Sequence, residues 1–219
     1  MEQPRQLPRK SLQLTQAEID AVSNELRLKG SLSELFGQPV FRRNLIVMVI
    51  IWSFCSFAFF LVPFYLATLD EKNMFLMSLA LAIAEVLSSI ICLTFVHGRD
   101  LKYMLSLFYL LTCIGALVIM CFDLIYHGDS QIPLAVGFLL LYVGVVTTFD
   151  LVYLIVLELF PTIYLATAYG ACNIVGRAIT ILSPLVARAH GSIPLGVLAV
   201  YSLICIMLPF ALVKVKKLN

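Results

Sequence analysis

Six long apolar stretches dominate this chain of 219 residues. A helix needs roughly 20 apolar residues to cross the hydrocarbon core of a bilayer. Only helices and closed β-barrels can cross it, because the bilayer holds no water to satisfy backbone polar groups. Long continuous runs favour helices over the strands of a barrel. The predicted spans are Leu45–Leu69, Met74–Val96, Tyr103–Ile125, Ile132–Leu157, Ile163–Val186 and Ile193–Val213.

The composition agrees with a membrane location, since 61% of the residues are hydrophobic and only 13% are charged. The sequence therefore predicts an all-α, polytopic integral membrane protein with six transmembrane helices surrounded by membrane lipid. The connecting loops are short, so neighbouring helices should run antiparallel. The chain divides into a polar leader (residues 1–43), a six-helix bundle (44–213) and a basic tail (214–219).

The positive charges predict the orientation of the bundle. Six spans put both termini on one side, where twelve lysines and arginines fall, against Lys72 and Arg188 on the other side. Cytosolic flanks are enriched in such residues, so both termini should face the cytosol, or the matrix of a mitochondrion. The plasma membrane is favoured, because acidic residues such as Glu18 and Asp20 are untypical of a mitochondrial presequence. The twelve are Arg5, Arg9, Lys10, Arg27, Lys29, Arg42, Arg43, Arg99, Lys102, Lys214, Lys216 and Lys217.

The polar leader lacks an apolar core and so predicts no cleavable secretory signal. Thr15–Glu18 fits a capping box, and a short helix is expected from Ala17 to Lys29, where Gly30 supplies a stop. Ser31–Glu34 should begin a further brief turn before Pro39. The alternative is a disordered tail with weak helicity.

No pattern in the sequence predicts an enzyme, a cofactor or a metal site. The six cysteines lie inside predicted spans without paired spacing or nearby histidines, as small apolar side chains would. The three histidines lie at the ends of different spans, and no glycine-rich phosphate loop is present. The positive charges flank spans and form no stripe with interleaved aromatic residues, so no nucleic-acid partner is expected.

Four motifs, in order along the chain, carry a resemblance to one transporter family. The first motif lies at the entry to the first span and within it, and consists of Leu35–Arg43, Trp52 and Ser56–Phe60. The other three are Ala84–Val86, His97–Asp100 and Glu158–Thr162. Together they resemble the C-terminal six helices of the organic cation/anion/carnitine transporters of the major facilitator superfamily. The resemblance covers residues from about 30 to 213 and implies one half of a facilitator fold.

The resemblance implies a half-size transporter of small organic ions that works with a second six-helix half, either in a homodimer or on a separate chain. It places Glu158, Pro161, Arg99 and Asp150 in a cytosolic gating network. The chain departs from the family at two positions of that network: Leu165 stands where an arginine is usual, and Asp100 where a second basic residue is usual. The alternatives are a transporter-derived structural subunit of a larger membrane complex and a truncated gene product.

Glu85 and Arg177 lie deep inside predicted spans. A charge at that depth costs several kcal/mol unless it is paired or faces a polar cavity, so both are candidate substrate-binding residues. In the resembling family, a basic residue at the position of Arg177 implies an organic anion or zwitterion, and aromatic residues at the positions of Phe59 and Phe60 approach the substrate. The alternatives are a structural Glu85–Arg177 pair and phenylalanines that face lipid.

Rows of small residues predict close helix packing on three spans. They mark sites of contact rather than of chemistry. The rows are Ala80, Ala84 and Ser88; Gly137 and Gly144; and Ala166 and Gly170.

Overall fold

A computed structural model of the chain describes residues 30–68, 71–95, 98–126, 131–189 and 191–213. These residues contain helices and no strand, and six helical segments are long and apolar enough to cross a membrane, which confirms the predicted fold class. The helices are α2 (Leu32–Gly37), α3 (Pro39–Leu66), α4 (Glu71–Phe95), α5 (Leu101–Tyr126), α6 (Gln131–Leu159), α7 (Thr162–Thr180), α8 (Ser183–Ala187) and α9 (Ile193–Met207), followed by the 3₁₀ helix η1 (Leu208–Ala211).

The first described residues form the predicted turn, and the first span begins earlier than predicted. The Ser31 Oγ accepts a hydrogen bond from the backbone N–H of Glu34 at 3.3 Å and starts α2. Helix α3 then begins at Pro39, because proline lacks a backbone N–H and its fixed φ suits the first helical position. The predicted helix from Ala17 to Lys29 and the basic tail lie outside the described residues.

The fifth span was predicted from Ile163 to Val186, and the corresponding apolar helical segment runs from Thr162 to Ala187 with a break inside it. Helix α7 ends at Thr180, and α8 begins at Ser183. Pro184 has no N–H to donate to the carbonyl of Thr180, four residues earlier. The Ser183 hydroxyl donates to that carbonyl instead, and the Thr180 hydroxyl donates to the Gly176 carbonyl at 2.8 Å. The span is therefore a broken helix.

The six long helices are arranged as two sets of three. Helices α3 and α6 contact each other at the centre. Helix α4 packs on α6, and α7 packs on α3. Helices α5 and α9 contact each other. α5 also packs on α6, and α9 contacts α3, with α8 beside it. The set α3–α4–α5 thus resembles α6–α7–α9 in these contacts, although α5 packs more extensively on α6 than α9 does on α3. Because consecutive spans alternate in direction, the two sets run in opposite directions.

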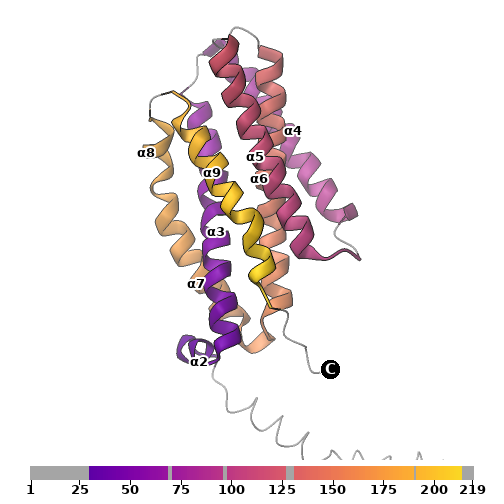
Figure 1. Cartoon of the computed structure of the whole chain (residues 1–219), viewed down its shortest axis with the longest axis vertical. Coiled ribbons are helices and arrows are strands. Elements are labelled where there is room, and N and C mark those ends of the chain that lie inside the picture. Colours follow the sequence, from indigo (N-terminus) through magenta and orange to yellow (C-terminus); the bar gives the residue numbers. More distant parts are fainter. Residues whose placement is uncertain (1–29, 69–70, 96–97, 127–130, 190, 214–219) are drawn as a thin grey trace, which may run out of the picture.

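The first and last described residues lie at the same end of the bundle (Figure 1), where hydrogen bonds hold them. The Asn44 side-chain amide donates to the Val213 carbonyl at 2.8 Å and accepts from the Val213 N–H at 2.9 Å. The Lys102 Nζ donates to the Leu212 carbonyl at 2.6 Å, and the Thr167 hydroxyl donates to the Gly30 carbonyl at 2.6 Å. The beginnings of α3, α5 and α7 and the end of the last span therefore lie together. Which side of the membrane they face stays a prediction.

Two of the three small-residue rows pack inside the chain. Ala80, Ala84 and Ser88 are buried on α4, and the Ser88 hydroxyl donates to the Val143 carbonyl of α6 at 3.2 Å. On α6, Gly144 faces α5 so closely that a Cβ would lie 2.7 Å from the Thr112 backbone nitrogen. The third row, on α7, has no such neighbour.

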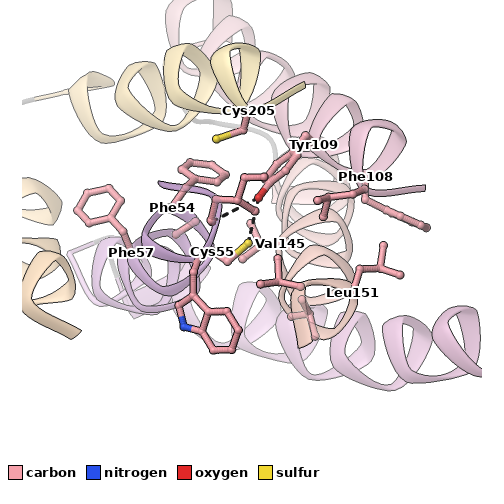
Figure 2. Packing of buried hydrophobic residues seen from close by; sticks show 14 of the residues in the cluster. Phe54, Cys55, Phe57, Phe108, Tyr109, Val145, Leu151 and Cys205 are labelled. Carbon is pink, nitrogen blue, oxygen red and sulfur yellow. Dashed lines mark hydrogen bonds between the residues drawn. The ribbon is translucent and has the colours of Figure 1, made fainter. Parts of the chain in front are cut away.

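Buried aromatic and aliphatic side chains of α3, α5, α6 and α9 form the core (Figure 2). Near its centre, the Tyr109 hydroxyl of α5 lies 3.1 Å from the Cys55 Sγ of α3, and the Phe54 ring stacks on Tyr201 of α9. Cys55, Cys113, Cys172 and Cys205 are all buried, as expected of small packing side chains.

Candidate functional site

The candidate site is the face of α3 and α6 that lies between α4 and α7. These two helices flank the bundle on opposite sides (Figure 1). Only 28% of the α4 span and 22% of the α7 span is buried against the rest of the chain, compared with 67% for α3 and for α6. The two charged candidate residues lie on these flanks, with Glu85 on α4 and Arg177 on α7.

Glu85 is exposed in the single chain, and its side chain bonds to α6. The Tyr142 hydroxyl donates a hydrogen bond to the Glu85 Oε1 at 3.3 Å. The sequence analysis did not single out Tyr142. Its phenol provides the carboxylate with a donor from the neighbouring helix and places an aromatic ring beside the charge.

Aromatic rings connect Tyr142 to the opposite flank. The Tyr142 ring stacks on Phe59 of α3 with centroids 5.9 Å apart, and Phe59 also stacks on Phe149 of α6 at 5.3 Å. Phe59 meets Phe60 edge to face, with centroids 5.4 Å apart and planes at 81°. Phe59 therefore packs against α6, which does not fit the alternative that it faces lipid.

The guanidinium carbon of Arg177 lies 5.8 Å from the centroid of the Phe60 ring, within the range of a cation–π interaction. Arg177 is also in the last turn of α7, where the negative end of the helix dipole favours a cation. A continuous series thus runs over four helices, from Glu85 through Tyr142, Phe59 and Phe60 to Arg177. We call these five residues the Glu85–Arg177 face.

The structure does not join Glu85 and Arg177 to each other. Among the described residues, the Glu85 carboxylate contacts Tyr142 and the Arg177 guanidinium contacts Phe60. A direct Glu85–Arg177 pair within one chain is not among these contacts. All four predicted substrate-binding residues nevertheless belong to one surface.

A second group of aromatic residues extends this surface toward the beginning of α7. Trp52 lies edge-on to Tyr153, with ring centroids 4.5 Å apart, and also edge-on to Tyr169 at 5.7 Å. Phe149 connects the group to Phe59 and contacts Tyr153 at 5.4 Å. The Trp52 Nε1 is buried without a hydrogen-bond partner. Tyr142, Phe149 and Tyr153 recur at spacings of seven and four, a helical pattern that could have identified this lining from the sequence.

The predicted gating residues are spread over the end of the bundle that carries α2. Glu158 is in the last turn of α6, Pro161 precedes α7, and exposed Arg99 precedes α5. Asp150 is half-buried on α6, eight residues before Glu158 and therefore about 12 Å farther from that end, at 1.5 Å per residue. Their gating role stays a prediction.

Asp100, which stands where the resembling family usually has a basic residue, has a local structural role. The Asp100 carboxylate accepts a hydrogen bond from the backbone N–H of Lys102 at 3.4 Å, and its carbonyl accepts from the N–H of Met104 at 3.3 Å. Asp100 therefore caps the beginning of α5, which a basic side chain at this position would not do.

The described residues include no group of His, Cys, Asp and Glu side chains that could hold a metal ion. An apolar groove does lie between the beginnings of α4 and α6, lined by aliphatic side chains from Leu76 to Ile83 and from Ile132 to Leu139. It has no polar side chain to orient an ion, so the Glu85–Arg177 face is the better candidate for chemistry. Comparisons of the chain with protein families and with curated proteins find no match.

Proposed function

We propose that this chain is one six-helix half of a facilitator-type transporter of small organic ions. The observation that carries the proposal is the Glu85–Arg177 face, which joins an acidic and a basic side chain through aromatic rings across an uncovered surface. Such a surface offers a charged group at each flank and apolar rings between them. These are the elements that a small organic ion requires for binding.

The arrangement of the spans in two sets of three that run in opposite directions supports the proposal. Inverted repeats of three helices occur within each six-helix half of facilitators, and the substrate site lies near the bilayer midplane, at the interface between repeats or halves. Exposed charges at this depth would cost several kcal/mol against lipid. Glu85 and Arg177 are both exposed in the single chain, so this face needs a partner that covers it.

The chemistry of the face favours an organic anion or a zwitterion. A guanidinium can hold a carboxylate through two parallel hydrogen bonds, which an ammonium cannot do in the same geometry. Phe60 lies beside Arg177, Phe59 packs on Phe60, and the two rings would contact the apolar body of the substrate. Glu85, at the opposite flank, would accept a hydrogen bond from a positively charged substrate group.

One observation favours a second candidate, a structural subunit of a larger membrane complex. Glu85 and Arg177 each have a partner within the chain, Tyr142 and Phe60. A surface whose charges are already partnered could also pack permanently against foreign helices. Under this alternative, the face would be covered by another protein and would bind no small ion.

Uptake by the protein, isolated gently with its natural partners and placed in lipid vesicles, tests the proposal. We expect saturable uptake of organic anions or zwitterions, abolished by Arg177→Asp and weakened by Arg177→Lys, since lysine lacks the planar fork. The matched control is Arg188→Asp, which reverses an exposed charge away from the face and should leave uptake unchanged. Equal uptake by Arg177→Asp and wild type would contradict the proposal.

A further inference from the structure

The two flanking helices carry the same kind of strip. On α4, the exposed residues Ser78, Ala82 and Ser89 share one side with Glu85, at positions i, i+4, i+11 and i+7. On α7, exposed Ala166 and Gly170 share one side with Arg177 at the same spacing. The nearest atoms to a Cβ built on Gly170 lie beyond 4 Å, so this small-residue row is open. Each flank thus carries small residues beside a charge, negative on α4 and positive on α7.

These opposite charges fit a second copy of the same chain. Two copies must have the same orientation in the membrane, because their positive flanks are identical. They are then related by a two-fold axis along the membrane normal, and the same surface of each copy forms the interface. Rotation about this axis sets α4 of one copy against α7 of the other. Glu85 then faces Arg177 of the partner subunit, and the contact occurs twice.

The depths of the two charges allow this contact. The Glu85 carboxylate bonds to Tyr142, which lies about 25 Å from Leu159 along α6, and Arg177 lies about 22 Å from Thr162 along α7, at 1.5 Å per residue. Leu159 and Thr162 are close in the chain, so both lengths start from a similar depth. A rotation about the membrane normal leaves depth unchanged. The difference of about 3 Å is within the combined reach of the two extended side chains. The hydrogen bond from Ser88 to Val143 places Ser89 at about 22 Å, and exposed Ile174 lies at about 18 Å on the same scale.

We infer that the second half of the transporter is a second copy of this chain, and that α4 packs on α7 of the partner subunit through two symmetric Glu85–Arg177 ion pairs. The inference rests on the proposed function in one respect, that this face docks a second half. A substrate carboxylate would reach Arg177 by displacing Glu85 of the partner subunit. Substrate binding and closure of the ion pair would then exclude each other.

Charge reversal separates this arrangement from any contact within one chain. Glu85→Arg alone, or Arg177→Glu alone, puts like charges at both contacts, and self-association of differently tagged copies should fall about tenfold or more. When the two variants are produced together, every contact again joins opposite charges, and a mixed dimer should form. Arg188→Glu is the control and should self-associate as the wild type does. Variants that still self-associate, or that fail to associate when mixed, would overturn the inference.

Disulfide cross-linking tests the same contact with the native charges in place, should the reversed variants not fold. Ser89→Cys in one copy and Ile174→Cys in the other should cross-link, whereas two copies of Ser89→Cys should not. Cross-linking between two Ser89→Cys copies alone would overturn the helix pairing. A wild-type chain that transports while bound to a different chain, with no second copy present, would overturn the inference and leave the proposed function standing.

Discussion

The crossing of α5 and α6 makes a quantitative prediction about stability. Each helix presents a glycine to the other at this crossing. A Cβ on Gly144 would lie 2.7 Å from the Thr112 nitrogen and 2.9 Å from the Phe108 carbonyl oxygen, and a Cβ on Gly115 would lie 2.6 Å from the Leu141 Cα. These obstructing atoms are backbone atoms, so no side chain can rotate away. Alanine at either position must therefore push the two helices apart.

The expected cost of Gly144→Ala follows from two opposing effects. Alanine is a better helix former than glycine by about 1 kcal/mol. Overpacking of a close contact costs about 1–3 kcal/mol, and the upper end applies because the contact is with backbone. The net loss in the free energy of unfolding should be about 2 kcal/mol, which is up to about a 30-fold change in the ratio of folded to unfolded protein.

Reversible unfolding in mixed micelles, followed by far-UV circular dichroism, measures this loss. The matched control is Gly196→Ala in α9, because no atom lies within 4 Å of a Cβ at that position. The control should be as stable as the wild type or more stable by up to about 1 kcal/mol. Equal stability of Gly144→Ala and Gly196→Ala would refute the close helix contact.

Three further predictions concern the ends of the bundle and its orientation. Asn44→Leu removes both hydrogen bonds to Val213 and should lower the free energy of unfolding by about 2 kcal/mol. Limited proteolysis of the C-terminal end measures this effect, and the same resistance in Asn44→Leu as in the wild type would contradict the prediction. Gly30→Ala should make α2 more susceptible to proteases. Gly30 has a φ of +65°, which costs a residue with a Cβ about 1 kcal/mol. Unchanged cleavage of α2 in the variant would contradict this prediction. Cysteine labelling should find residues 70–73 on the side opposite to residues 214–217, and labelling of both from one side would contradict the predicted topology.

The sequence was sufficient for the number and position of the spans, because length and apolarity alone decide whether a helix can cross a bilayer. It also identified Ala80, Ala84 and Ser88 as a packing row. It missed the break after Thr180, although Pro184 indicates one, because the break depends on which group donates a hydrogen bond to the free Thr180 carbonyl. In the structure, that group is the Ser183 hydroxyl.

The candidate site was predictable as a set of residues but not as a surface. Glu85 and Arg177 are conspicuous as charges in apolar segments. Whether Glu85 and Arg177 belong to one surface depends on which sides of α3 and α6 lie between α4 and α7. A helix that is apolar all round has no periodic pattern that would indicate those sides. Tyr142 was missed for the same reason, since a tyrosine in an apolar span resembles a packing residue until its hydroxyl is placed against Glu85.

Binding of an organic anion, followed through the fluorescence of Trp52, tests the central claim most directly. Trp52 is the single tryptophan of the chain, and its Cδ1 lies close to Gly176, the residue before Arg177. Titration of the purified protein with organic anions and zwitterions should give a saturable change in fluorescence. The change should disappear in Arg177→Asp and persist in Arg188→Asp. A saturable change of equal size and midpoint in Arg177→Asp would contradict the assignment of the Glu85–Arg177 face as the binding site.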